Sequence, residues 1–361
     1  MDNKSDKTIS FAEDGTCNYC NEALKRMPIE YFPGVDGEIK LNKVMDRIKM
    51  ECKGNEFDCI VGVSGGVDSS YVLYLGHKYG LRMLAIHVDD GLDTEIAKAN
   101  IDRICSKTRT KLINVKPCLD QYKDLILSFF KASVPNVAIP QDNIIIKELL
   151  NACKKFKINY SLSGVNFSME SILERSGGVN ACDKKHIIEI HRKFSNKSLD
   201  RLTFISLSER YIWSRLNRKI NIVKPLNYIN YNLENTITTL SSFCNYVYYG
   251  GKHYESILCR FLQCWYLPTK YNLDKRKSHF SSLIISGQMN REEALSRLSE
   301  PAYLSEELKE YDFNFLANYL GLSRKEFDNL VMSSPKLHTD YPMSDLNKLA
   351  PFARKFRKFL Q

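Results

Sequence analysis

The sequence has no apolar run long enough to cross a membrane, and its polar beginning, MDNKSDKTIS, is unlike a secretory signal. It also contains no internal repeat and no low-complexity linker. The 11 cysteines are an odd number and are scattered, whereas a disulfide framework has densely spaced pairs. These absences exclude a membrane-spanning or disulfide-stapled protein and predict a globular chain with reduced thiols in the cytoplasm.

The length of 361 residues allows one large or two smaller domains, and the apolar fraction of 43% is that of a globular protein. The net charge of +10 has two interpretations: a nucleic-acid partner, or a pocket for ATP and a second phosphorylated substrate. A basic cluster from Lys348 to Lys358 is interpreted as the solvated face of an amphipathic helix.

Apolar runs alternate with helical patterns between residues 56 and 225, which predicts an α/β fold. The expected strands are Asp58–Val63, Met83–Val88, Leu112–Val115, Tyr160–Ser163 and Ile220–Val223. The expected helices include Leu92–Thr108, Leu119–Ala132 and Asn143–Lys157. This rhythm is typical of βαβ units, so we expect a parallel sheet covered on both faces.

Three consecutive parts are expected along the chain. Residues 1–50 form a segment with glycine turns and cysteines, residues 51–235 form the α/β domain, and residues 236–361 form a mainly helical domain. The last boundary is placed where the strand rhythm stops.

The most informative motif follows the first expected strand and reads Ser64-Gly65-Gly66-Val67-Asp68-Ser69-Ser70. A glycine turn that leads from a buried strand into a helix leaves N–H groups unpaired, and the helix dipole favours an anion there. The order Ser-Gly-Gly-x-Asp-Ser resembles the PP-loop of ATP pyrophosphatases, which bind the pyrophosphate portion of ATP and release AMP. The lysine of the other common phosphate loop, Gly-x-x-x-x-Gly-Lys-Ser/Thr, is missing. An ordinary strand–helix turn is the less favoured alternative.

Two further strand ends carry small and polar residues. One reads His87-Val88-Asp89-Asp90-Gly91, and the other reads Ser163-Gly164-Val165-Asn166. Because the carboxyl ends of parallel strands share one edge, we expect nucleotide contacts from Asp89, Gly91, Gly164 and Asn166. For Asp89 and Asp90, capping of the next helix is the alternative.

Release of AMP requires a substrate oxygen to attack the α-phosphorus while pyrophosphate leaves. The donors for the leaving charge are the turn amides with the hydroxyls of Ser64, Ser69 and Ser70. Mg²⁺ is expected as a cofactor, with Asp68 as its ligand or the anchor of its water. A nitrogen or sulfur nucleophile then displaces AMP from the activated oxygen.

The chain lacks the nucleophile of a built-in glutaminase. Position 2 is Asp, and no cysteine lies in a Gly-x-Cys-x-Gly elbow. Ammonia would therefore come from a partner protein. A sulfur-transfer enzyme would need a cysteine pair near the nucleotide, but Cys59 lies inside a strand, and Cys105, Cys118 and Cys153 are isolated structural thiols.

The Cys-x-x-Cys pair of Cys17 and Cys20 is the chain's single motif of this kind. It can hold half of a tetrahedral zinc site, which needs four ligands. A metal-free pair of reduced cysteines is an equal alternative.

The expected second domain carries a polar segment from Tyr248 to Ser256. Gly250 and Gly251 precede Lys252 and His253, which predicts a turn that presents cations at a helix start, where they suit phosphate oxygens. A function is also favoured for Lys275, Arg276 and Lys277 over a solvated loop. Residues 290–294 predict an ordinary capped helix, with Asn290 as the cap and Glu293 in the capping-box position.

Several segments together resemble the N-acetyl sugar amidotransferases, PP-loop enzymes of bacterial surface-polysaccharide biosynthesis. The segments are ISFAEDGTCNYC, SGGVDSS, HVDDGLDTEIAKANI, SGVNFSMES, YYGGKHYESI and LDKRKSHFSSLIISGQMNREEAL. The resemblance implies a nucleotide-binding domain of the adenine nucleotide α-hydrolase type and a role in the synthesis of LPS O-antigen sugars. It also implies an ATP-dependent conversion of the acetamido group of a nucleotide-linked sugar to an acetamidino group.

The same resemblance implies partners and site residues. Ammonia would come from a glutaminase subunit, with a cyclase-type barrel subunit like that of imidazole glycerol phosphate synthase. Asp68, Lys252 and His253 would be catalytic. The substrate-binding residues would be Gly250, Gly251, Lys252, His253, Tyr254, Glu255, Lys275, Arg276 and Lys277. Relatives carry another Cys-x-x-Cys ahead of the position of Met1, and this sequence departs from them there, so Zn²⁺ at Cys17 and Cys20 is in question.

Two alternatives stay open. A tRNA-modifying PP-loop enzyme, such as a thiolase or a lysidine-type ligase, would suit the basic charge, although no RNA-binding module is recognisable. A non-catalytic subunit that only holds nucleotide is disfavoured by the intact SGGVDSS motif.

Overall fold

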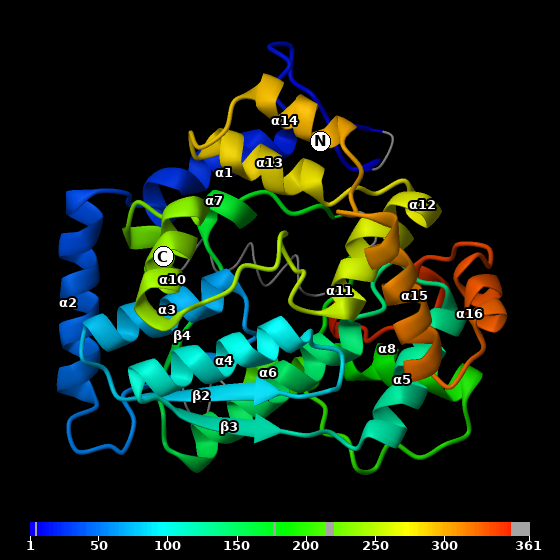
Figure 1. Cartoon of the computed structure of the whole chain (residues 1–361), viewed down its shortest axis with the longest axis horizontal. Coiled ribbons are helices and arrows are strands. Elements are labelled where there is room, and N and C mark those ends of the chain that lie inside the picture. The colour runs from blue at the N-terminus through cyan, green and yellow to red at the C-terminus, as the bar shows by residue number, and fades with distance from the viewer. Residues whose placement is uncertain (4–5, 176–177, 214–219, 348–361) are drawn as a thin grey trace. The chain divides into compact units, whose positions relative to one another are not determined.

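The computed structural model describes residues 1–3, 6–175, 178–213 and 220–347 (Figure 1). The basic cluster from Lys348 to Lys358 lies outside the described residues. The chain forms two compact units: Met1–Val115, Ala152–Ser176 and Ile220–Asp312 make unit 1, and Lys116–Asn151, Gly177–Lys219 and Phe313–Gln361 make unit 2. Both units are discontinuous in sequence, and the three consecutive domains expected from the sequence stay a prediction.

Unit 1 contains a five-stranded parallel sheet. Its strands are β1 (Cys59–Gly62), β2 (Met83–Val88), β3 (Lys111–Val115), β4 (Tyr160–Leu162) and β5 (Asn221–Val223). Their order is β3-β2-β1-β4-β5, and all neighbours are parallel. The α/β prediction is confirmed, and each strand end lies within one residue of its expected place.

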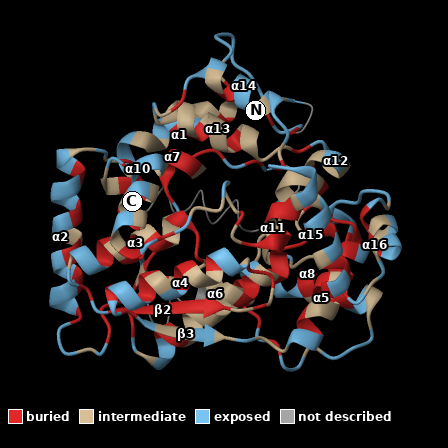
Figure 2. Cartoon of the chain, in the orientation of Figure 1, coloured by how far each residue is buried: buried red, intermediate tan, exposed pale blue. Residues whose placement is uncertain are grey.

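The sheet is buried because its strands are apolar on both faces. Val61 and Ala85 face a core that also contains Met45 of α2 (Val35–Glu51) and Leu73 of α3 (Val67–Lys78). On the opposite face, Ile60 is equally buried. Figure 2 shows β2 buried along its length. This continuous burial is what near-uninterrupted apolar strands predict.

The sheet has a topological switch point between β1 and β4. The chain runs from β1 to β2 and β3 on one side, and continues through β4 to β5 on the other. The loops after β1 and β4 therefore diverge at neighbouring strand ends, which is where open α/β sheets bind ligands. Ser64 and Gly164 follow these two strands.

The remaining described elements of unit 1 are mainly helical. They include α1 (Asn18–Glu30), α4 (Glu95–Thr108), α7 (Phe167–Glu170), α10 (Leu233–Cys244), α11 (Ile257–Phe261), α12 (Leu267–Tyr271), α13 (Arg276–Ile285) and α14 (Arg291–Ser299). Figure 1 shows α13 packed beside α7 and α1. The expected cap of α14 is confirmed, since the Asn290 side chain accepts a hydrogen bond from the Glu293 N–H at 2.8 Å. The Glu293 carboxylate instead pairs with Arg297.

Unit 2 is helical and includes α5 (Leu119–Ala132), α8 (Lys184–Phe194) and α16 (Arg324–Val331). α5 packs against both α8 and α16, with Phe130 edge-on to Phe327. α6 (Ile139–Lys155) and α15 (Glu306–Tyr319) each contribute residues to both units. The sequence-based helix over Leu119–Ala132 is confirmed at both ends.

Among the described residues, no helix combines the length and the apolar composition that a bilayer-spanning helix requires. All 11 cysteines are free thiols, and Cys59 lies fully buried in β1 as expected.

Candidate functional site

The turn after β1 depends on a glycine that no other residue could replace without strain. Gly65 has a φ of +74°, and a Cβ at this position would lie 2.3 Å from the Ala97 carbonyl oxygen. The next glycine, Gly66, is the N-cap residue of α3 and has no side chain to bond the first turn. The start of α3 therefore has no side-chain cap, and this helix end has positive dipole character.

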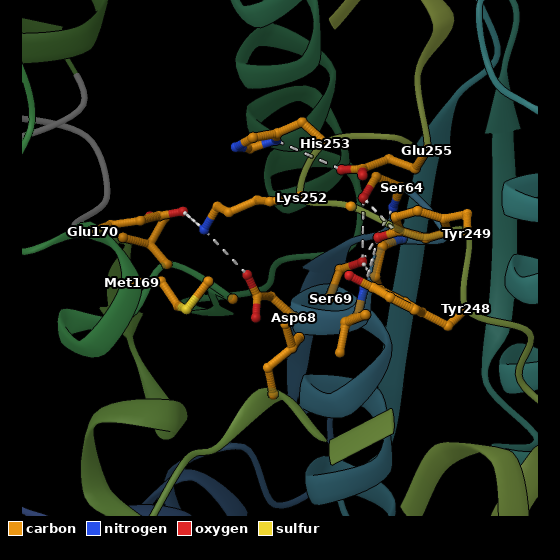
Figure 3. Close-up of a pocket in the computed structure, with 16 residues that line it drawn as sticks. Ser64, Asp68, Ser69, Met169, Glu170, Tyr248, Tyr249, Lys252, His253 and Glu255 are labelled. Atoms are coloured by element: carbon orange, nitrogen blue, oxygen red, sulfur yellow. Dashed lines mark hydrogen bonds and ion pairs between the residues drawn. The ribbon is translucent and has the colours of Figure 1, made fainter. Parts of the chain in front are cut away.

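A cavity of about 180 Å³ opens in front of this turn, within unit 1 (Figure 3). One wall is formed by the turn and the start of α3, which contribute Ser64, Gly66, Asp68 and Ser69. The Ser64 hydroxyl accepts a hydrogen bond from the Gly66 N–H at 3.3 Å. The wall thus combines amide and hydroxyl donors, which is the chemistry that suits phosphate oxygens.

The loop after β4 closes a second side of the cavity. Gly164 and Glu170 both line it. A Cβ on Gly164 would lie 3.1 Å from the Asp68 backbone carbon, so glycine allows the β4 loop to approach the start of α3 closely. Gly164 lines the cavity, and its expected contact with the nucleotide stays a prediction.

The third side is the turn between α10 and α11, which contributes Gly251, Lys252, His253 and Glu255. The Lys252 ammonium lies 2.9 Å from Glu170 Oε1 and 3.7 Å from Asp68 Oδ2. Figure 3 shows it extended between the two carboxylates. Burial opposes its charge, but Asp68 and Glu170 outweigh burial and hold the pKa of Lys252 above its ordinary value.

Asp68 receives two stabilising contacts. The Tyr231 hydroxyl donates to Asp68 Oδ1, and Lys252 faces Asp68 Oδ2. Burial is nevertheless the largest influence, so the pKa of the Asp68 carboxyl is raised from its ordinary value. Asp68 and Glu170 offer the carboxylate oxygens that hard divalent cations prefer, and the side chain between them is a cation, so the residues present fit Mg²⁺.

Glu255 is a buried carboxyl that lacks full hydrogen bonding. Its Oε2 atom has no hydrogen-bond partner, and its Oε1 atom lies 3.8 Å from His253 Nδ1. Burial raises the pKa of Glu255 to about 7. A carboxyl that titrates near neutrality can exchange a proton with a ligand at working pH.

His253 is held neutral in a strained backbone conformation. Its φ is +63°, which is unusual for a residue other than glycine. Burial lowers the pKa of His253 to about 3, and Lys252 and Lys275 add to this effect. The ring lies 5.8 Å from that of His279. Lys252 and His253 thus reach the cavity from a turn, and not from the helix start that the sequence suggested, because α11 begins at Ile257.

Three tyrosines that the sequence reasoning missed hold the turn in place. Tyr231 bonds Asp68, the Tyr246 hydroxyl donates to the Gly65 carbonyl at 2.9 Å, and the Tyr249 hydroxyl accepts from the Val67 N–H at 3.2 Å. Glu170 was missed as well. Glu170 lies in the segment SGVNFSMES that carries part of the family resemblance, but its helix is too short to show a period and the residue was not singled out.

Some expected nucleotide contacts are not among the residues that line the cavity. Ser70 is buried within α3, and Asn166 caps α7 by accepting from the Met169 N–H at 3.0 Å. Asp89 and Gly91 follow β2 behind the turn. Neither Asp89 nor Asp90 caps α4, whose cap is Thr94. The nucleotide role of these residues stays a prediction.

The three side chains of the expected cationic cluster form ion pairs with carboxylates close to them in space. Lys275 lies 3.5 Å from Glu174, Arg276 forms an ion pair with Asp274 at 2.8 Å, and Lys277 pairs with Asp2. None of the three lines the cavity. Tyr254 is likewise turned away, with its hydroxyl donating to the Ala302 carbonyl at 2.7 Å, while Gly250 shapes the turn with a φ of +97°.

Cys17 and Cys20 lie together at the start of α1, with their sulfurs 3.3 Å apart. Burial raises the pKa of Cys20 to about 11. Within the described part of the chain, no third His, Cys or carboxylate completes this pair as a metal-binding group. The residues present supply half of a zinc site and do not by themselves fit a closed one.

Comparison with known proteins identifies the C-terminal region. Residues 255–356 match the family described as LPS biosynthesis protein WbpG-like, C-terminal domain. This region of the chain is similar to that domain. This match begins at Glu255, on the wall of the cavity, and continues through residues of both compact units. No curated protein matches the sequence.

Two solved structures are similar in part. An NH3-dependent NAD synthetase from Campylobacter jejuni is 17% identical, with 49% of this chain and 76% of that chain covered and a TM-score of 0.30. An NMN synthetase from Francisella tularensis is 12% identical, with 59% and 94% covered and a TM-score of 0.32. At these values neither likeness carries an argument about function.

Proposed function

We propose that this chain is an ATP-dependent amidotransferase that converts the acetamido group of a nucleotide-linked sugar to an acetamidino group. The observation that carries the proposal is the cavity itself. It joins the Ser64–Ser69 wall, which has the donors of a PP-loop, to the turn at which the WbpG-like domain begins. The description of that domain supports a substrate in LPS biosynthesis.

The first half-reaction activates the amide. The acetamido oxygen attacks the α-phosphorus of ATP, and pyrophosphate leaves. The amides at the start of α3 and the hydroxyls of Ser64 and Ser69 bind the departing charge. Mg²⁺ held by Asp68 and Glu170 would neutralise phosphate charge, and Lys252 reaches the same place.

The second half-reaction forms the amidine. Ammonia attacks the activated carbon, the C–O bond to AMP breaks, and the new nitrogen loses a proton. Glu255 is placed to accept this proton because its carboxyl lies in the cavity wall and titrates near neutrality. His253, held neutral beside it, serves as a hydrogen-bonding contact to the sugar or its phosphates.

Ammonia would be supplied by another protein, a glutaminase subunit with a barrel subunit of the cyclase type. The support is the lack of a glutaminase-type cysteine in the sequence. A chain that uses ammonia from a partner should also accept free ammonium at high concentration.

The test is to incubate the protein with ATP, ammonium and candidate nucleotide-linked acetamido sugars. The expected products are AMP, pyrophosphate and a sugar one mass unit lighter, because NH has replaced oxygen. AMP formation that depends on tRNA, with no effect of any sugar, would contradict the proposal and favour the tRNA-modifying alternative.

A variant makes the assignment of Asp68 testable. Asp68→Asn keeps an oxygen for Tyr231 but removes the negative charge beside Lys252, so AMP release should fall by a factor of about a hundred or more. Asp102→Asn on the exposed side of α4 is the control. Equal turnover by both variants, with unchanged thermal unfolding, would remove the role given to Asp68.

A further inference from the structure

A second group of side chains that could hold a metal ion lies at the end of β2, the strand paired with β1. His87, Asp89 and Asp93 each offer one ligand atom, and these atoms lie within 4.8 Å of one another. His87 and Asp93 are buried, whereas Asp89 is partly exposed. The proposed function uses none of the three side chains in a step.

The backbone fixes the orientation of the His87 ring. His87 Nδ1 lies 2.9 Å from the Val63 carbonyl oxygen, which can only accept, so Nδ1 carries the hydrogen. The other ring nitrogen, Nε2, is then available either as a lone pair or as a second N–H. A carbonyl that fixes one nitrogen so that the other can bind a metal is a common arrangement around metal-ligating histidines.

Asp93 provides the independent observation. Its side chain is 8% exposed, and its Oδ2 atom is buried without a hydrogen-bond partner. His87 Nε2 lies 3.2 Å from this oxygen, yet the contact falls outside hydrogen-bond geometry. A buried carboxylate oxygen that has no aligned hydrogen-bond donor is costly and favours a further partner.

The separation of these atoms suits a shared ion. Two ligands at about 2.0–2.1 Å from a tetrahedral zinc ion lie about 3.3 Å apart, close to the observed separation of Nε2 and Oδ2. In such a site the nitrogen lone pair points at the ion and not at the oxygen. The misdirected contact between His87 and Asp93 is therefore what a shared ion would produce.

We propose that His87, Asp89 and Asp93 form a binding site for a divalent transition-metal ion such as Zn²⁺. The imidazole ligand favours such an ion over Mg²⁺, so this site is distinct from the carboxylates of Asp68 and Glu170. Asp89, being partly exposed, gives the ion a route from solvent and leaves room for water as a fourth ligand.

A metal ion at this site would stabilise two walls of the cavity, the Ser64 turn and the segment that contains Glu255. Val63, which holds His87, directly precedes Ser64. On the other side, Asp93 pairs in an antiparallel bridge with Ser256, and the Thr94 N–H donates to the Glu255 carbonyl at 2.9 Å. An ion joining His87 to Asp93 would thus fix the turn and Glu255 relative to each other.

Charged side chains near His87, Asp89 and Asp93 affect how strongly this site would bind a metal ion. Lys98 is the nearby cation that acts on both Asp89 and Asp93, and it is held 2.9 Å from Glu95. The competing state of the site is a metal-free pair in which His87 is protonated and faces the Asp93 carboxylate. In this competing state the chain would retain no zinc in the test below.

The test measures metal content and thermal unfolding of the full chain, so it does not depend on any substrate. Cys17→Ser and Cys20→Ser are introduced first to remove the cysteine pair. After incubation with Zn²⁺ and removal of excess ion, this background should retain one zinc per chain and unfold at a higher temperature than after treatment with a chelator. His87→Gln or Asp93→Asn should lose the zinc, and Asp102→Asn should keep it.

Because a buried substitution can disturb folding, Co²⁺ is the second probe, used on the unsubstituted site in the same background. A weak visible absorption typical of nitrogen and oxygen ligands, at one Co²⁺ per chain, supports the site. The proposal is overturned if that background binds no stoichiometric metal, or if folded Asp93→Asn binds as much as its parent. Absence of amidotransferase activity would leave this result unaffected.

Discussion

Gly65 shows how strictly a single residue is constrained at the turn. Its positive φ and the approach of the Ala97 carbonyl both exclude a side chain. Gly80 shares a positive φ, +68°, but has open space around its Cβ position and is exposed. Gly65→Ala should therefore destabilise the protein by about 2–4 kcal/mol, and Gly80→Ala by about 1 kcal/mol. Equal shifts of the two unfolding temperatures would contradict the geometry of the turn.

Glu255 makes a prediction about pH. Its pKa is raised from 4.5 to about 7, so between these values the folded state keeps a proton that the unfolded chain releases. The free energy of unfolding must therefore fall as the pH rises through this window, by up to about 3 kcal/mol, and level off above it. Glu255→Gln removes this dependence.

The measurement compares unfolding temperatures of the wild type and Glu255→Gln across that window. The variant should gain stability relative to the wild type as the pH rises, and Glu293→Gln, at a partly exposed carboxylate on α14, should not. Parallel curves for the wild type and Glu255→Gln would show that Glu255 titrates normally.

A buried ion pair joins α11 to α15. Arg260 is 5% exposed and Asp312 is fully buried, with two hydrogen bonds of 2.6 and 2.8 Å between them. Asp312→Asn leaves a buried guanidinium without its counter-charge and should cost about 3–5 kcal/mol. The exposed pair of Arg297 and Glu293 should contribute less than about 1 kcal/mol when Glu293 is changed to Gln. Denaturant unfolding measures both, and a small cost at Asp312 would contradict the pairing.

Helices and strands with a clear pattern of apolar residues could be predicted from the sequence, whereas very short elements could not. The buried strands and the helix over Leu119–Ala132 were predictable because apolar runs and helical spacing extend over whole turns. α7, with four residues, has too few positions to show a pattern, and it carries Glu170. Thr94 was not singled out as the cap of α4, because Asp89 and Asp90, the alternative caps, are equally suitable by residue type.

The site was predictable where residues follow one another along the chain. Ser64–Ser70 and Gly250–Glu255 are local motifs, and both contribute to one cavity. The tyrosines at 231, 246 and 249 contact the turn from 163 to 182 residues away along the chain, and no local signal reveals such contacts. Distance along the chain also hides the pairing of Lys275 with Glu174 and of Lys277 with Asp2, whereas Arg276 pairs with Asp274 two residues before it.

At the scale of the whole molecule, the chain crosses between its two compact units several times. Residues 255–356 of the WbpG-like match contribute to both. Such a division rests on contacts between distant segments, so composition and strand rhythm along the sequence could not reveal it.

Unit 2 provides a pH test of its own. The Asn136 N–H donates to His338 Nε2 at 3.3 Å, so His338 Nδ1 donates to His186 Nε2 at 2.9 Å, and His186 Nδ1 donates to the Pro342 carbonyl at 3.0 Å. This chain of bonds requires both rings to be neutral. Burial lowers the pKa of His338 to about 3, with His186 adding to it.

His338 therefore binds a proton below pH 6.5 in the unfolded chain, whereas in the folded state it binds one only below about pH 3. The free energy of unfolding must fall as the pH falls through this window. His338→Asn keeps a donor for His186 and removes the titrating ring, so its loss of stability with falling pH should be shallower. His77→Asn, at an exposed position, is the control. If calorimetry gives the same change of unfolding free energy with pH for the wild type and both variants, the neutral pair of His186 and His338 is contradicted.

The central claim is that the cavity at the Ser64 turn activates an amide oxygen. The most direct measurement follows that oxygen, using a nucleotide-linked sugar whose acetamido oxygen is labelled with the heavy isotope. With ATP and ammonium present, the label should appear in AMP and should be lost from the sugar product. Label that stays on the sugar, or AMP that carries oxygen from water alone, would contradict it.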